Sequence, residues 1–318
     1  MDKLFTIRSR YPESVIGGIE IETCVDLSDF IKVDLPVLTD ELGDQKEQER
    51  WRNHGYIWDE TDEGEWVYKP SDAQLAKLNI PPYVATLDDS IVCRGEQGVR
   101  GLIPVEYITK EPYPIVDIID GTSGVGKATN KIMGLTHACK ENDDYEVSCG
   151  THVHMSYNGI DKRNYPNFNV VMRYLWIAYY QPYCLIKFYG FQNRHENMRY
   201  SPISTEKPIG KHEMFNEKPS ENSTFWHFEF RGYGEMRSKW NMVAKEYLKI
   251  LMNLWIEAID YYKRNNISKV KNVRIEPSPT ETSDLERTLQ DQLKTAYDMP
   301  PVYYRLKWDS GATGQLKF

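Results

Sequence analysis

Residues 17–23 read GGIEIET, so two glutamates stand on either side of one isoleucine directly after a pair of glycines. Two later stretches repeat this spacing with other ionisable side chains: CGTHVHMSY (149–157) and FWHFEFRGY (225–233). The three polar pairs are Glu20 and Glu22, His152 and His154, and Glu229 and Arg231. Alternate residues of a β-strand project from the same face, about 7 Å apart, so we expect each pair to share one face while apolar residues fill the other.

Three such strands side by side would gather three carboxylates, two imidazoles and one guanidinium on one face of a sheet. Burying that much charge is costly unless metal ions or charged ligands compensate it. Each pair has a simpler alternative: a solvated strand face for the glutamates, one core and one surface histidine, and a structural ion pair for Glu229 and Arg231. Because all three pairs occur in one chain, the sequence predicts a metal-dependent active site.

The composition is that of an ordinary globular protein. The chain has 318 residues, of which 40% are hydrophobic and 27% charged, and it is long enough to bury a core. A net charge of −8 argues against nucleic-acid binding, which needs a basic surface. The first fourteen residues contain no apolar core of signal-peptide length, no apolar run in the sequence is long enough to span a membrane, and its five cysteines include no CxxC motif. We therefore expect a protein with reduced thiols in the cytoplasm (the host's, if a virus or phage encodes it), without nucleic-acid or membrane partners.

The hydrophobic pattern indicates short strands mixed with long helices, without regular alternation of the two. Strands are expected at 15–25, 84–94, 101–108, 147–157 and 224–233. Helices are expected at 128–141, 167–189 with an interruption at Pro182, 236–266 and 283–297. The segment 26–83 is acidic and rich in loop residues, which indicates an insertion with a short helix near 37–50 and a hairpin at 55–69. This arrangement predicts an α+β fold with an antiparallel sheet.

Several motifs taken in order resemble a known family: GIEIET (18–23), DDS (88–90) followed by VEYI (105–108), CGTHVHMS (149–156) and FEFR (228–231). They resemble the amidoligase family of the glutamine synthetase and glutamate–cysteine ligase superfamily, whose members are carboxylate–amine ligases. The resemblance implies a glutamine-synthetase-like catalytic domain, with a curved, mainly antiparallel sheet that carries the site on one face and helices on the other. Residues 1–266 would form this domain, with the acidic insertion at about 26–83, and residues 267–318 would be a C-terminal extension.

The resemblance also implies an activity. Members of the superfamily bind ATP and two or three Mg²⁺ or Mn²⁺ ions, phosphorylate a carboxylate, and let an amine displace the phosphate to form an amide. This chain would then be an ATP-dependent amide ligase that joins a small-molecule or peptide carboxylate to an amine through an acyl phosphate. A carboxylate near the amine must accept its proton. Asp89 or a carboxylate of the acidic insertion could serve, and at the first of these places the chain has Asp88-Asp89-Ser90 where the family often has Asp-Gly-Ser.

Carried over motif by motif, the resemblance assigns roles to individual residues. The metal ligands would be Glu20, Glu22, Glu106, His152 and Glu229. His154 would contact the ATP phosphates, and Arg231 would hold a phosphate or the acyl phosphate. The stretch NRHENMRYSP (193–202) resembles the arginine-bearing loop of the family, which makes Arg194 and Arg199 candidates for contacts with the γ-phosphate or the substrate.

Residues 115–129, IVDIIDGTSGVGKAT, support a competing interpretation. They match a P-loop in which Gly121 to Lys127 follow an apolar strand and open a helix, as in a nucleotide-dependent kinase. Ala128 stands where the motif places a Ser or Thr for Mg²⁺, and no apolar strand ending in Asp follows. A third interpretation is a catalytically inactive binding module on the ligase fold. The charged residues present in all three pairs argue against it.

Overall fold

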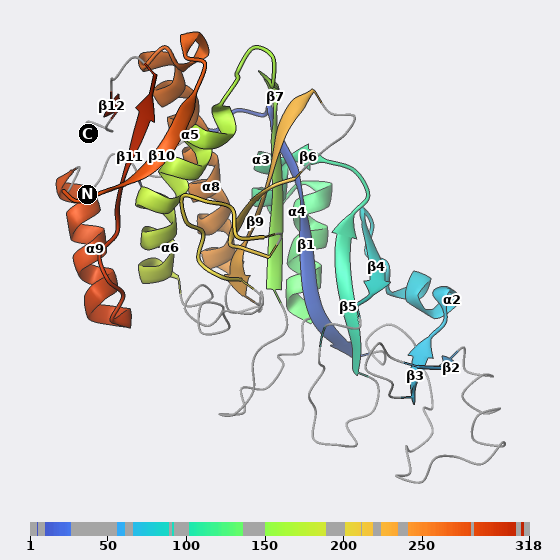
Figure 1. Ribbon diagram of the computed structural model, residues 1–318. Helices are drawn as coiled ribbons and strands as arrows, with labels where there is room; N and C mark the ends of the chain where they lie inside the picture. Colours follow the sequence, from blue (N-terminus) through green and yellow to red (C-terminus); the bar gives the residue numbers. More distant parts are fainter. Residues whose placement is uncertain are drawn as a thin grey trace.

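The computed structural model describes residues 5, 10–26, 56–60, 66–88, 91, 102–135, 150–188, 201–210, 212–218, 224–234, 241–280, 283–309 and 313–314 (Figure 1). A seven-stranded sheet lies at the centre of the molecule, and the long helices pack against one of its faces. A three-stranded sheet and one further helix lie on the side of these helices away from the large sheet.

The large sheet is antiparallel throughout. Its strands are β1 (Val15–Asp26), β4 (Tyr83–Leu87), β5 (Leu102–Thr109), β6 (Tyr113–Pro114), β7 (Gly150–Asp161), β8 (Phe215–Glu217) and β9 (Phe225–Gly234). They follow the order β4-β5-β1-β7-β9-β8, and β6 pairs with the beginning of β1. Every pairing between them is antiparallel, which confirms the predicted α+β fold.

Helices cover the apolar face of this sheet. They are α3 (Ile115–Ile119), α4 (Gly124–Leu135), α5 (Phe168–Leu175), the π-helical turn η3 (Trp176–Tyr180), α6 (Gln181–Lys187) and α8 (Asn241–Arg264). The rings of Phe228 on β9 and Trp255 on α8 lie 5.4 Å apart, and those of Phe230 and Trp176 lie 5.3 Å apart. Both phenylalanines are completely buried. The apolar neighbours of Glu229 therefore face the helices, so the polar residues between them face the other way.

Smaller elements complete the described chain. The strands β2 (Tyr56–Glu60) and β3 (Trp66–Pro70) form the hairpin predicted at 55–69 and are followed by α2 (Asp72–Leu75) and the 3₁₀ turn η2 (Ala76–Leu78). The C-terminal elements are η5 (Ile267–Lys269), β10 (Val273–Ser278), α9 (Asp284–Tyr297), β11 (Tyr303–Trp308) and β12 (Thr313–Gly314). Helix α9 confirms the helix predicted at 283–297. It begins after Ser283, whose Oγ accepts a hydrogen bond from the Glu286 N–H at 3.1 Å, as an N-cap does.

Some element boundaries differ from the predictions. Strand β4 ends at Leu87 instead of reaching 94, because its next partner on β5 would be Pro104, which has no N–H to donate. An interruption was expected at Pro182, and the structure has a π-helical turn just before this residue. Pro182 itself lies in the first turn of α6, where proline is tolerated. Helix α4 begins at Gly124 rather than at 128. The helix expected near 37–50 lies outside the described residues.

The remaining expectations concern thiols, charge and membranes. Cys24 takes part in a disulfide bond, so the expectation of reduced thiols is wrong for this residue, whereas Cys184 is a buried free thiol.

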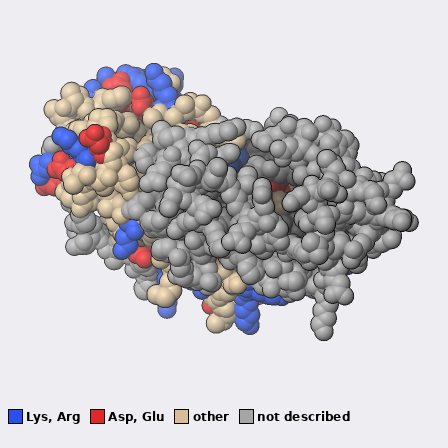
Figure 2. All heavy atoms as spheres, turned by 90° about the horizontal axis from the view of Figure 1, so that it is seen from below, with Lys and Arg blue, Asp and Glu red and all other residues tan. Residues whose placement is uncertain are grey.

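None of the described helices combines the length and the apolar composition that a membrane span requires. Figure 2 shows basic and acidic side chains of the described residues side by side at one end of the molecule.

Candidate metal centre

The polar pairs meet on the face of the sheet opposite the helices. The register places Glu20 of β1 opposite His152 of β7. On the other side of β1, Glu22 lies opposite Glu106 of β5. Because β1 runs between β5 and β7, its two glutamates form the middle of a cluster that extends over four neighbouring strands.

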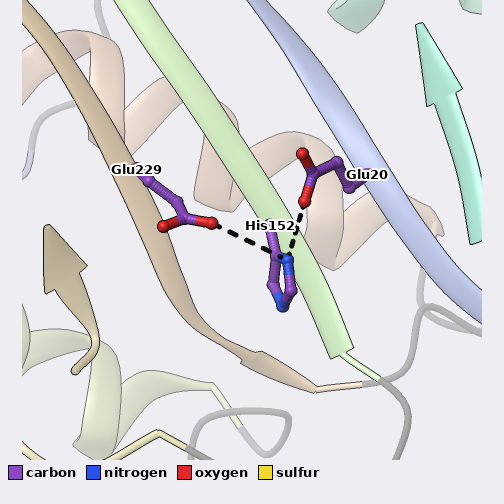
Figure 3. A group of neighbouring side chains, drawn as sticks. All are labelled: Glu20, His152 and Glu229. Atoms are coloured by element: carbon purple, nitrogen blue, oxygen red, sulfur yellow. Dashed lines mark hydrogen bonds and ion pairs between the residues drawn. The ribbon is translucent and has the colours of Figure 1, made fainter. Parts of the chain in front are cut away.

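Figure 3 shows the first group of ligand atoms, in which Glu20 and Glu229 approach His152 from the strands on either side of it. The Nδ1 atom of His152 lies 2.9 Å from Oε2 of Glu20 and 3.8 Å from Oε1 of Glu229. One ligand atom from each residue lies within 4.8 Å of the others. This spacing allows the three side chains to bind one metal ion.

A second group consists of Glu22, Glu106 and His152, again with ligand atoms within 4.8 Å of one another. Here the other ring nitrogen of His152, Nε2, lies 3.2 Å from Oε1 of Glu22. This nitrogen is buried and makes no hydrogen bond within the described structure. His152 therefore belongs to both groups, and each of its nitrogens faces one of them.

The carboxylates of the cluster differ in their affinity for protons. Burial, with the negative charges of Glu20 and Glu22, raises the pKa of Glu106 to about 8. Burial also acts to raise the pKa of Glu20, but hydrogen bonds from His152 and His154 outweigh it and hold this pKa well below its usual value. Glu106 therefore keeps its proton to a higher pH than Glu20 does.

Two basic side chains contact Glu229, which is almost completely buried. Arg231 Nη1 lies 3.0 Å from Oε1 of Glu229, and Lys218 Nζ lies 2.7 Å from Oε2. Burial acts to raise the pKa of Glu229, but the charges of Arg231 and Lys218 and the hydrogen bond from Lys218 outweigh it and lower this pKa. The carboxylate therefore stays ionised in an environment that would otherwise favour its neutral form.

His154 is held between two strands on the same face. Its Nε2 lies 2.8 Å from Oε1 of Glu20, and its Nδ1 lies 3.2 Å from Nε2 of His227. Burial, helped by the positive charge of His154, lowers the pKa of His227 to about 4, so His227 is neutral at pH 7. Both ring nitrogens of His154 are thus engaged, which fixes the orientation of the ring.

The glycines before Glu20 allow the strands to approach one another closely. A Cβ atom at Gly17 would overlap the carbonyl oxygen of His154 and lie 2.9 Å from Cδ1 of Ile115. Beside them, a cavity of about 410 Å³ adjoins the metal cluster. Its lining includes Gly18, Glu20, Thr109, Lys110, His154 and His227. The cluster therefore opens into a space large enough for part of a ligand.

The structure brings together most of the residues singled out from the sequence. The cluster contains the five predicted metal ligands together with His154 and Arg231. Arg194, Arg199 and Asp89 lie outside the described residues. Sequence reasoning missed Lys218 and His227. His227 precedes Glu229 by two residues and so shares its face, a signal that was available, whereas Lys218 follows a three-residue strand without any recognisable pattern.

The P-loop interpretation is wrong. Helix α3 occupies residues 115–119, where the motif requires a strand. A Cβ atom at Gly126 would overlap the carbonyl oxygen of Asp120, so this glycine serves the packing of α4 against the preceding turn. The hydroxyl of Thr129 in α4 lies 2.7 Å from that of Tyr83, which ties the segment to the apolar face of the sheet.

The donor set of the cluster fits divalent cations. Carboxylate oxygens are the ligands that Mg²⁺ prefers, and one shared imidazole suits Mn²⁺ as well. Glu22, His152 and Glu229 are each at most 5% exposed, so their charges are largely removed from water. Carboxylates this close together at low exposure require positive charge nearby. The candidate site is thus a centre of carboxylates and imidazoles, in which two overlapping groups of ligand atoms could each hold a cation.

Comparisons with known proteins add little to this geometry. No protein-family model matches the sequence, and no curated protein matches it. One solved structure with a partly similar backbone is the complex between the prokaryotic ubiquitin-like protein Pup and its ligase PafA. It is 11% identical, covers 96% of this chain and 56% of that chain, and has a TM-score of 0.32. This chain thus spans little more than half the length of the matched chain, and at this TM-score the likeness supports no conclusion about function.

Proposed function

We propose that the chain is an ATP-dependent, divalent-metal-dependent carboxylate–amine ligase that forms an amide bond through an acyl phosphate. The observation that carries this proposal is the pair of ligand groups that share His152, with the basic side chains of Arg231 and Lys218 beside one of them. Two adjacent cations and fixed positive side chains are what the transfer of a phosphoryl group requires, because this reaction depends on charge neutralisation and alignment.

The residues of the cluster divide this work. Bound Mg²⁺ or Mn²⁺ would neutralise the nucleotide phosphates and hold the γ-phosphate in line with the acceptor. Glu22 and Glu106 would hold one ion and Glu20 and Glu229 the other, and His152, which as a neutral imidazole has one free ring nitrogen, would be a ligand of one of the two. Once a metal ion binds Glu20, the Nε2–H of His154 would be released from this carboxylate to donate a hydrogen bond to a phosphate oxygen, while His227 still holds Nδ1. Arg231 would stabilise the negative charge of the acyl phosphate until the amine displaces phosphate.

The space beside the cluster and the rest of the chain complete the proposal. The cavity next to His154 would hold part of the nucleotide or of the carboxylate substrate, a small molecule or a peptide. Arg194 and Arg199 would contact the γ-phosphate or the substrate, and Asp89 would accept the proton of the amine. Residues 1–266 would form the catalytic domain, with the acidic insertion at 26–83, and residues 267–318 an extension of it.

The test is release of ADP and phosphate from ATP, measured with Mg²⁺ or Mn²⁺ and mixtures of carboxylic acids and amines. We expect turnover that needs both substrates and the metal. Glu22→Gln should lower it about a hundredfold or more, since even residues that only support metal ligands affect activity 10- to 100-fold. Glu246→Gln, the same change on the surface of α8, should leave turnover unchanged. If no mixture gives metal-dependent turnover and Glu20→Ala leaves nucleotide binding unchanged, the proposed ligase activity is overturned.

A further inference from the structure

Lys218 reaches the buried part of the cluster from an edge of the sheet. It follows β8 directly, and its backbone N–H donates to the carbonyl oxygen of His227 at 3.0 Å, so it continues the ladder with β9. Its side chain is 34% exposed, whereas that of Glu229, 2.7 Å from its Nζ, is 1% exposed. A flexible side chain from the rim thus places its ammonium group on a buried metal ligand.

Glu229 already has two cationic partners in the metal-free protein. Arg231 contacts Oε1 and Lys218 contacts Oε2, so both carboxylate oxygens are engaged. A metal ion held by Glu20, His152 and Glu229 would be a third cationic group beside this carboxylate. Like charges at such short distances repel strongly where little water screens them. The first ligand group can therefore bind a metal ion tightly only if one basic side chain moves away.

Of the two basic side chains, Lys218 is the one free to move. Arg231 lies on the same strand as Glu229, and its side chain is 16% exposed. Lys218 has a four-carbon stem and twice that exposure. A displaced ammonium group needs a new anion, and a phosphate that arrives with the metal ion supplies one.

We propose that Lys218 neutralises the Glu229 carboxylate as long as no nucleotide is bound. When a metal ion binds to Glu229, the Lys218 ammonium group leaves this carboxylate and contacts a nucleotide phosphate instead. The binding of metal ion and nucleotide at the Glu20, His152 and Glu229 group is thereby coupled. This inference rests on the proposed function and adds to it a phosphate-binding residue and an order of binding.

The experiment measures Mn²⁺ binding to the metal-free protein from the electron paramagnetic resonance signal of free Mn²⁺, with and without a non-hydrolysable ATP analogue. In the wild-type protein we expect the analogue to raise the affinity of one Mn²⁺ about tenfold or more, within the usual range of coupling between sites. Lys218→Met should bind this ion about tenfold more tightly without the analogue and lose most of the enhancement. Lys218→Arg, which keeps the charge, should retain the coupling.

Lys162→Met is the matched control, because the Lys162 Nζ lies 5.3 Å from the ring centre of Trp226, a residue of β9 that shares a face with Phe228 and not with Glu229. It should behave as the wild-type protein does. Should Lys218→Met fail to fold, as judged by circular dichroism, Lys218→Gln removes the charge with a polar side chain and tests the same point. A normal enhancement in the uncharged variant overturns the inference alone. If the wild-type protein binds no Mn²⁺ even with the analogue, the proposed function is overturned as well.

Discussion

The two faces of the central sheet consist of alternate residues of the same strands, yet they contribute oppositely to stability. On the helix side, Ile21, Val153 and Phe228 are completely buried, and burying apolar surface stabilises the fold by about 25 cal/mol per Å². On the other side, Glu22 and Glu229 are almost as deeply buried although they carry ionisable groups, which costs free energy. The free energy gained by burying the apolar face thus offsets the cost of burying ionisable groups on the polar face. Substitutions on the apolar face should therefore lower stability, and substitutions on the polar face should lower activity.

The largest expected effect comes from breaking the apolar face. Phe228 packs between Phe215 on β8 and Trp255 on α8, with ring centres 5.3 and 5.4 Å away. Phe228→Ala should lower the free energy of unfolding by about 3–5 kcal/mol, measured by urea denaturation, because a buried cavity replaces the ring. Met242→Ala, at a site that is 84% exposed, should change almost nothing. A loss below about 1 kcal/mol for Phe228→Ala would mean that this face is loosely packed.

A smaller effect concerns the pH dependence that the polar face imposes on the metal-free protein. The pKa of Glu106 is raised from 4.5 to about 8, so the folded state holds this proton more tightly than the unfolded state. The stability that neutral Glu106 contributes is therefore fully present below pH 4.5 and is lost as the pH rises to 8. Thermal unfolding should show the Tm of the wild-type protein decreasing from pH 5 to pH 8 relative to that of Glu106→Gln.

Mg²⁺ should reduce this decrease in Tm, because the ion binds the deprotonated carboxylate. Glu111→Gln, which changes an exposed glutamate just beyond β5, should follow the wild-type curve. Parallel curves for the wild-type protein and Glu106→Gln would show that Glu106 loses its proton at the same pH in the folded and unfolded states, and would remove it from the buried cluster.

The difference between the two faces could be predicted from the sequence because it depends only on alternation within a strand. The register across strands could not. Strands β7 and β9 shift in register between Thr151 and Val153, and this irregularity places His154 opposite Glu229. Nothing in either strand taken alone indicates such a shift, since it depends on how the two backbones pair.

The role of Lys218 could not be predicted for a similar reason. Strand β8 has three residues and reaches the site only through its pairing with β9, so no pattern within the strand marks it. The misleading P-loop motif illustrates the opposite case, in which a pattern is present but local. An apolar run as short as 115–119 suits a strand or a buried helix equally well, and packing against the rest of the molecule makes it a helix.

The smallest expected effect tests whether the helix side of the sheet takes part in catalysis at all. Lys127, which a P-loop would place on the nucleotide phosphates, is exposed on α4, and α4 is tied to the apolar face through Thr129 and Tyr83. Lys127→Ala should therefore leave ATP turnover and nucleotide affinity within about twofold of the wild-type values, as surface substitutions usually do. Arg231→Met, on the polar face, should lower turnover in the same assay. Loss of turnover in Lys127→Ala, with turnover retained in Glu22→Gln, would move the nucleotide site to the helix side and reverse the assignment of the two faces.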